Sequence, residues 1–163
     1  QEGTYRLPEA QLDRFMVKIE VHYPSLTEEQ KILSEFHQRN NSFDISAVTP
    51  VMSREQLTRF RQSLREIRAE ENLLHYIAEI THQTRNNPAL SLGASPRASL
   101  GILMASKAFA AMEGRDFITP DDIKNVAATV LRHRIMLTPE KEMEGITPED
   151  VITQIITRIE IPR

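Results

Sequence analysis

The chain is 163 residues long, 40% apolar and 26% charged, which suits one well-buried core or a small domain with an extension. Its net charge of −3, with both signs interspersed, disfavours a dedicated nucleic-acid binder, because such proteins usually carry a basic face. The absence of cysteine excludes disulfides, thiolate nucleophiles and cysteine-bound metals, and it fits a reducing, cytoplasmic location.

The first 24 residues are predicted to combine a loop with one strand. Gly3, Pro8 and the polar residues around them predict a loop or short turn. From Phe15 to Val21 apolar and polar side chains alternate, which predicts a half-buried strand. A lone strand cannot satisfy its backbone hydrogen bonds, so we expect its sheet in upstream sequence. The lack of an initiator Met at Gln1 also indicates an internal fragment.

The rest of the chain is predicted to be helical, apart from a short extended stretch at residues 135–137. A Ser or Thr cap with Gln or an acid three residues later satisfies free amides at a helix start, and proline suits the first helical position. One further helix is predicted for residues 70–84 from its apolar spacing. The start signals are Thr27 with Gln30, Ser53 with Gln56, Ser95-Pro96, Thr119-Pro120 and Thr147-Pro148.

The longest predicted helix begins at Ser95 and ends at Gly114. Its apolar spacing predicts one buried stripe along the helix. No apolar run in the chain approaches the roughly 20 residues that span a bilayer, so no membrane span is expected. The residues of the predicted stripe are Leu100, Leu103, Met104, Ala108, Ala111 and Met112.

No familiar catalytic or metal-binding motif is present in the sequence. The five histidines form neither His-Glu-x-x-His nor another metal-ligand spacing, so no metal site is expected. There is no Gly-x-Ser-x-Gly nucleophile and no Gly-x-x-x-x-Gly-Lys-Ser/Thr phosphate loop. No apolar run ends in Asp-Glu, which would supply magnesium-holding acids. We therefore expect that the chain alone cannot hydrolyse a nucleotide.

Two arginines stand where a phosphate could be bound. Arg14 directly precedes the predicted strand, and Arg97 lies in the first turn of the longest predicted helix. The planar, permanently charged guanidinium suits phosphate recognition better than an ammonium does. The alternative for each arginine is a solvated side chain or an exposed ion pair of little energetic weight.

A small basic cluster, Arg132-His133-Arg134, follows the helix that begins at Thr119. We interpret it as a solvated helix end, where cations complement the negative end of the helix dipole. The alternative is a contact with a client protein or with nucleic acid.

Four segments resemble MoxR-type AAA+ ATPases, and they occur in the order of that family. The first resembles the segment after sensor 1, the second resembles the sensor 2 helix, and the last two resemble the lid. One departure is Arg6, where the family usually has proline. The segments are residues 1–15 (QEGTYRLPEAQLDRF), 93–99 (GASPRAS), 114–123 (GRDFITPDDI) and 131–134 (LRHR).

The resemblance implies the C-terminal part of such an ATPase, with a mainly α fold. A helical AAA+ lid bundle would follow one orphan strand from the truncated core. Residues 1–24 would end the core, residues 25–52 would form the core-closing helix and a connecting loop, and residues 53–163 would form an inserted helix and the lid. Walker A, Walker B and sensor 1 would lie upstream.

The resemblance also implies a role for each arginine. Arg14 would be the arginine finger, acting in trans on ATP in a neighbouring subunit, and Arg97 would be sensor 2, acting in cis or in trans. The parent would hydrolyse ATP with Mg²⁺, with neither expected on the fragment alone. It would assemble into a homo-oligomeric ring, often a hexamer, and remodel or mature client proteins alongside von Willebrand factor A domain partners. No nucleic-acid partner is implied.

Two other functions remain open from the residues alone. One is a free-standing helical protein-interaction module, and the other is a nucleic-acid-binding helical domain. The predicted strand favours the ATPase over the free-standing module, because that strand needs a sheet. The acidic net charge disfavours the nucleic-acid binder.

Overall fold

A computed structural model describes residues 7–40, 42, 45–46 and 48–162 of the chain. Gln1–Arg6 lie outside the described residues, and with them the departure at Arg6. The chain forms two compact units. The larger unit consists of residues 1–19 and 62–163, and the smaller unit of residues 20–61.

The smaller unit contains α2 (Leu26–Gln38) and most of α3 (Arg54–Ser63). Helix α2 has a capping box, but its cap is Ser25 with Glu28 rather than the predicted Thr27 with Gln30. At α3 the prediction is confirmed, because the Gln56 amide donates to Ser53 Oγ at 3.2 Å and the Ser53 amide donates to Gln56 Oε1 at 2.7 Å. Neither helix contains a buried residue among those described.

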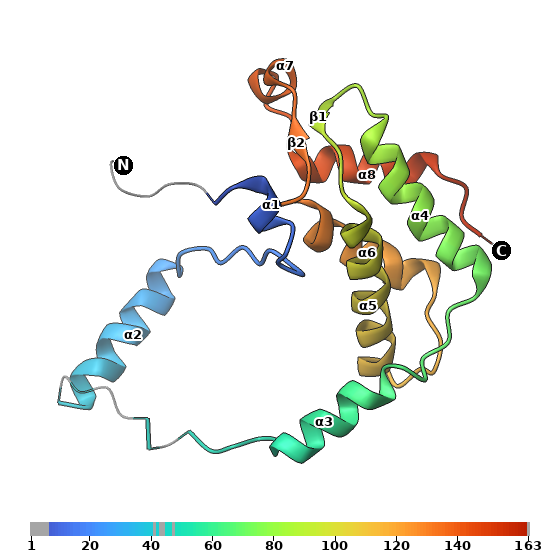
Figure 1. The fold of residues 1–163 in the computed structure, drawn as a ribbon. Coiled ribbons are helices and arrows are strands. Elements are labelled where there is room, and N and C mark those ends of the chain that lie inside the picture. The colour runs from blue at the N-terminus through green and yellow to red at the C-terminus, as the bar shows by residue number, and fades with distance from the viewer. Residues whose placement is uncertain (1–6, 41, 43–44, 47, 163) are drawn as a thin grey trace. The chain divides into compact units, whose positions relative to one another are not determined.

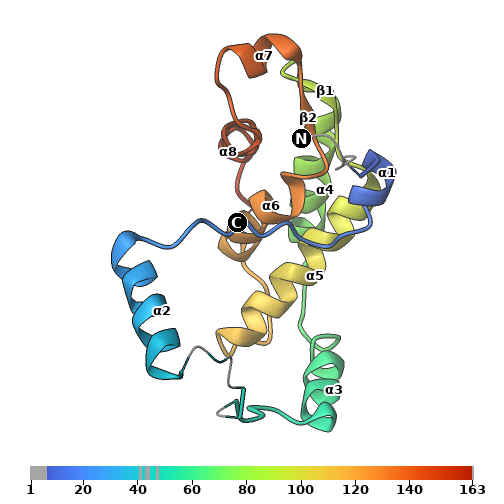
Figure 2. The same ribbon diagram turned by 90° about the vertical axis from the view of Figure 1, so that its left-hand side faces the viewer.

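The larger unit is a helical bundle with one small sheet (Figures 1 and 2). Helix α5 packs on α4 and α6, and α8 also packs on α4 and α6. Strands β1 and β2 pair antiparallel. Among the described residues, no helix is both long and apolar enough to cross a membrane. The elements are α1 (Glu9–Leu12), α4 (Glu71–Arg85), β1 (Leu90–Leu92), α5 (Pro96–Met112), α6 (Pro120–Leu131), β2 (Met136–Leu137), α7 (Pro139–Met143) and α8 (Pro148–Arg158).

The helix starts of the larger unit follow the predicted signals. Ser95 caps α5, and Thr119 and Thr147 cap α6 and α8 with complete capping boxes. A proline occupies the first turn of all three helices. Gly114 follows α5 with a φ of 72°, a conformation that other residues adopt only at a cost.

The predicted strand at Phe15–Val21 is wrong. These residues form no strand, and their side chains are exposed. In this segment the Lys18 amide donates to the carbonyl of Thr129, at 3.1 Å, so it bonds to the end of a helix rather than to a strand. Alternation of side chains predicts which face is buried only where a neighbouring strand completes a sheet. The sheet of the described chain lies elsewhere, in β1 and β2.

The predicted buried stripe of α5 is wrong for three of its six residues, whereas Leu103 and Ala111 of the stripe are partly buried against the core. Leu100, Met104 and Met112 are 62%, 60% and 82% exposed. Helix α5 instead buries a face of mostly small residues, because small side chains allow a neighbouring helix to approach closely. A Cβ added at Gly101 would lie 3.0 Å from Val130 Cγ1 of α6. The buried residues of α5 are Ala98, Gly101, Ile102, Ser106 and Ala110.

Candidate functional site

Arg14 lies in the turn that follows α1. Its backbone amide donates to the carbonyl of Gln11 at 3.1 Å, and its side chain is exposed to solvent. Within the described part of the chain its guanidinium has no ion-pair partner. The side chain is therefore available to an anion supplied by another molecule.

Arg97 lies in the first turn of α5, and the loop before it is firmly held. The Ala94 amide donates to Thr84 Oγ1 at 2.9 Å, and Arg85 Nε donates to the Ala94 carbonyl at 2.8 Å. At Gly93 the loop runs so close to α4 that an added Cβ would lie 2.6 Å from the Cα of Arg85. Glycine is thus required sterically, and the loop fixes the direction in which α5 begins.

Asp13 joins the turn that carries Arg14 to the start of α5. Ser95 Oγ donates to both carboxylate oxygens of Asp13, at 2.8 and 3.0 Å. Arg97 Nη1 lies 3.3 Å from Asp13 Oδ2, while the Arg97 side chain remains 59% exposed. Burial alone would raise the pKa of Asp13, but hydrogen bonds from Ser95 and Arg97 and the charge of Arg134 outweigh it and lower that pKa. Asp13 is therefore ionised at neutral pH.

Arg134 holds the same turn from the end of α6. It is 7% exposed, and it donates five hydrogen bonds, which matches the number of N–H groups on a guanidinium. Nε donates to Asp13 Oδ1 at 3.1 Å. The four remaining bonds reach backbone carbonyls, those of Asp13, Phe15, Met16 and Val130. The prediction of a solvated helix end is therefore wrong for Arg134, because it is buried and four of its five bonds reach residues far away in the sequence.

The other two members of the basic cluster are also engaged. His133 Nε2 lies 2.9 Å from the carbonyl of Phe15, and because a carbonyl only accepts, Nε2 carries the proton. Its Nδ1 is buried without a partner among the described residues. Burial is the main cause that lowers the pKa of His133, and the charges of Arg134 and Lys18 act in the same direction. Arg132 Nε lies 3.1 Å from Glu149 Oε1 of α8.

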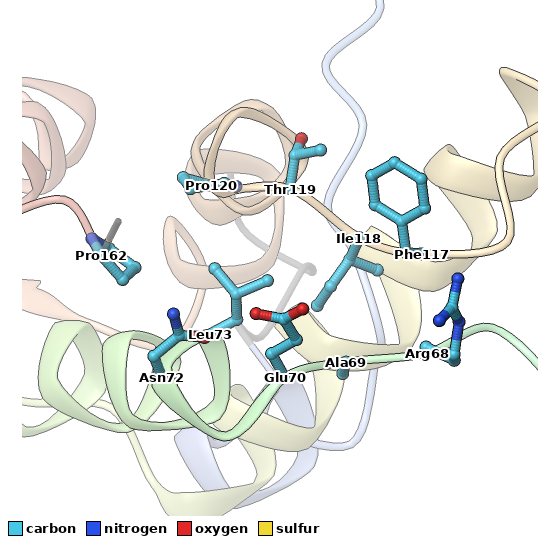
Figure 3. A pocket seen from close by; sticks show the side chains of 10 residues that line it. All are labelled: Arg68, Ala69, Glu70, Asn72, Leu73, Phe117, Ile118, Thr119, Pro120 and Pro162. Carbon is cyan, nitrogen blue, oxygen red and sulfur yellow. The ribbon is translucent and has the colours of Figure 1, made fainter.

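A hollow elsewhere in the larger unit offers less chemistry. It lies between the starts of α4 and α6, where Arg68 and Phe117 form a parallel β-bridge (Figure 3). Glu70 is its only carboxylate lining residue, and Arg68 is engaged by Asp116 at 3.0 Å. Among the described residues there is no group of three or more His, Cys, Asp or Glu side chains placed to hold a metal. The cluster around Asp13 is therefore the stronger candidate site.

Three relatives resemble the chain over nearly its whole length. YeaC, an uncharacterized protein of Bacillus subtilis, is 40% identical over 161 residues, which are 99% of this chain and 49% of that protein. The chaperone MoxR1 of Mycobacterium tuberculosis is 35% identical over 176 residues, which are 99% of this chain and 44% of that protein. A crystal structure of a protein from Cytophaga hutchinsonii, proposed to be an ATPase, is 34% identical, has a TM-score of 0.88, and matches 100% of this chain and 51% of that one.

The family model of the AAA lid domain matches residues 82–155, which run from α4 to α8 and include Arg97 and Arg134. The chain spans about half the length of the curated relatives it matches. The mainly helical fold agrees with the expectation of a lid bundle. The chain therefore contains an AAA lid domain and is similar, over nearly its whole length, to the lid-containing part of MoxR-type AAA+ ATPases.

Proposed function

We propose that this chain supplies the residues with which one subunit of an ATPase ring acts on the ATP of its neighbour. Arg14 is the arginine finger, and Arg97 is sensor 2. Both act in trans on the same nucleotide. Asp13 is the observation that carries this proposal, because it directly precedes Arg14 and forms an ion pair with Arg97. A single carboxylate thus links the backbone of one arginine to the side chain of the other.

The residues present suit a phosphate ligand. Arg14 is exposed, and Arg97 is exposed at the start of a 17-residue helix, where the positive end of the helix dipole favours anions. ATP supplies the phosphoryl group, and Mg²⁺ neutralises part of its charge. A positioned arginine stabilises the charge that develops during phosphoryl transfer, and an arginine finger is typically worth about 10³–10⁵ in rate. The phosphate loop and the Walker B acid that this proposal requires belong to the full-length ATPase and are not among these 163 residues.

The proposed assembly and its work are supported by the similarity to MoxR-type ATPases. Trans action requires a homo-oligomeric ring, and we propose a hexamer in the cytoplasm. We propose that hydrolysis drives the remodelling or maturation of client proteins, and the similarity to the chaperone MoxR1 supports this. Proteins with a von Willebrand factor A domain are proposed partners, and nucleic acid is not. The division into a core end (1–24), a connecting part (25–52) and a lid with its inserted helix (53–163) stays a prediction.

The free-standing interaction module is now disfavoured on different grounds. The strand that argued against it is absent from Phe15–Val21. The length of the relatives now argues against a free-standing module, because the chain matches only about half of each of them.

Mixing two inactive variants of the full-length ATPase tests this proposal. Arg14→Ala should leave ATP binding nearly intact while hydrolysis falls about 10³-fold or more, because the contact forms mainly in the transition state. A variant without its Walker B acid should be inactive because of its own pocket. Mixed rings contain some interfaces that pair a sound pocket with a sound Arg14, so the rate of phosphate release should partly recover.

Arg97→Ala provides the second half of the test. If Arg97 also acts in trans, mixing Arg97→Ala with the Walker B variant should restore hydrolysis, whereas mixing it with Arg14→Ala should restore none. Recovery in the second mixture would show that the two arginines serve different nucleotides. If subunit exchange is demonstrated and Arg14→Ala with the Walker B variant stays at background, Arg14 does not act in trans.

A further inference from the structure

We propose that Arg134 is a positioning residue for Arg14, and that it acts by fixing the backbone of the turn that carries the finger. This inference rests on the proposed role of Arg14. It assigns a function to the conspicuous basic cluster at the end of α6. Arg134 itself is buried, and all five of its N–H donors are used within the chain.

Arg134 forms hydrogen bonds with the residues on both sides of Arg14 in the sequence. Its guanidinium donates to the carbonyls of Asp13 and Phe15, one on each side of Arg14, and to the carbonyl of Met16. His133 adds a bond to the Phe15 carbonyl. The turn has little support of its own, because α1 spans only Glu9–Leu12 and contains no buried residue. The end of α6 therefore provides much of the contact that holds this turn.

The base of this contact is rigid. Arg134 Nη1 also donates to the carbonyl of Val130, within the last turn of α6. Val130 is fully buried, and a Cβ added at Gly101 of α5 would lie 3.0 Å from Val130 Cγ1 and 3.7 Å from Arg134 Nη1. Close packing of α5 on α6 thus fixes the guanidinium, and the guanidinium fixes the turn.

Arginine is the side chain that this geometry requires. All five N–H donors are used, in the plane of one guanidinium. A lysine has three donors on a single nitrogen and cannot serve five acceptors, so Arg134→Lys should keep the charge and lose most of the positioning. A finger displaced by about 1 Å can lose on the order of 10²-fold in rate without any loss of substrate binding.

The test uses the full-length ATPase with Arg134→Gln and Arg134→Lys. Both should lower kcat at least tenfold while the dissociation constant for ATP changes less than twofold. The matched control is Arg115→Gln, which breaks the arginine–aspartate pair at the opposite end of α6. That control should change kcat less than twofold. Hydrogen exchange in a peptide covering residues 12–18 should become faster in the Arg134 variants than in the control.

Mixed rings separate positioning in trans from a general loss of structure. Arg134→Gln mixed with the Walker B variant should regain hydrolysis, because its own pocket is sound. Arg134→Gln mixed with Arg14→Ala should regain none, since both are defective on the same side of the interface. Recovery in that second mixture would overturn the proposal. If Arg134→Gln does not fold, Asp13→Asn replaces it, with the same pattern expected because Asp13 is the charged acceptor of Arg134.

The remaining outcomes distinguish the two proposals. If Arg14→Ala is inactive while both Arg134 variants hydrolyse ATP at the normal rate, the finger stands and the positioning role fails. If Arg14→Ala itself hydrolyses ATP normally, the proposed function fails, and the positioning role fails with it. If Arg115→Gln lowers kcat as much as Arg134→Gln, the effect reflects loss of lid structure, which also overturns the positioning role.

Discussion

An arginine–aspartate pair lies at each end of α6, but one pair joins residues close together in the sequence and the other joins residues far apart. At the start, Arg115 donates to both oxygens of Asp122, at 2.6 and 2.8 Å, and the two residues are seven positions apart. At the end, Arg134 binds Asp13, which is 121 positions away. The first pair fixes how a helix begins, whereas the second ties a remote turn to the lid.

The local pair is also part of a helix cap. Asp122 accepts from the amide and the hydroxyl of Thr119, at 2.7 and 2.9 Å, and is 2% exposed. Burial alone would raise the pKa of Asp122, but the hydrogen bonds from Arg115 and Thr119 outweigh it and lower that pKa. The comparison suggests that the start of α6 serves stability, while its end serves the site. Changes at the two ends should therefore differ in what they damage.

The largest effect on stability is expected for Asp122→Ala. It removes the cap of α6 and leaves Arg115 without its carboxylate, which should lower the free energy of unfolding by about 2–3 kcal/mol. Urea unfolding followed by circular dichroism measures this loss. The matched control is Asp150→Ala, because Asp150 forms the same capping box with Thr147 but has no arginine partner among the described residues. Equal losses in the two variants would show that capping, and not the arginine, dominates.

Local signals explain which parts of the fold could be predicted. The caps at Ser95, Thr119 and Thr147 predicted three helix starts correctly, because each signal is complete within four residues of sequence. No end signal was evident in the sequence for helix α3, which ends at Ser63, and α7 was not predicted. Boundaries without a cap depend on contacts with distant residues, which spacing does not show.

Apolar spacing was ambiguous where a helix is apolar on more than one side. Helix α5 offers a face with Leu100 and Met104 and a face with Ala98 and Ile102, and the structure buries the second. The larger side chains suggested the wrong face, because small side chains allow two helices to pack closely. Alternation at Phe15–Val21 failed for a related reason, since it depends on a neighbouring strand.

The candidate site was only partly accessible from the sequence. Arg14 and Arg97 were selected through the resemblance, and their roles stay predictions. Arg134 was read as solvated because its five acceptors lie mostly in the turn after α1, more than a hundred residues away. Nothing in the sequence around Asp13 indicated that it would bind Ser95, Arg97 and Arg134. A charged residue reveals its partner in sequence only when that partner is close, as Asp122 is to Arg115.

A smaller effect is expected from pH, and it concerns the end of α6. The pKa of His133 is lower in the folded chain than its ordinary value of about 6.5, so the unfolded chain binds more protons as pH falls. The contribution of His133 to stability is complete above about pH 6.5 and is lost as pH decreases through the lowered pKa. The free energy of unfolding should therefore fall with decreasing pH in this range.

His133→Asn isolates this effect, because the other histidines remain in the variant. Unfolding free energies measured from pH 7.5 downward should decrease less steeply in the variant than in the unchanged chain. The pKa of Asp13 is also lowered, so its contribution is lost only at more acidic pH, below its ordinary value of about 3.9. Equal slopes for the two proteins between about pH 7 and 5 would contradict the assignment of a neutral, partly buried His133.

The smallest effect is expected for Asp121→Ala, although Asp121 is the direct neighbour of Asp122. Its side chain is 83% exposed, and within the described part of the chain it forms an ion pair with Lys124, at 3.1 Å. Exposed pairs contribute little because water and salt screen them, and a carboxylate near a helix start adds a few tenths of a kcal/mol. The unfolding free energy should fall by at most about 0.5 kcal/mol in the urea experiment used for Asp122→Ala. Since both aspartates face the same helix dipole, a loss at Asp121 equal to that at Asp122 would mean that charge alone stabilises the start of α6. A clear difference would assign the stability to the buried bonds that Asp122 makes with Thr119 and Arg115.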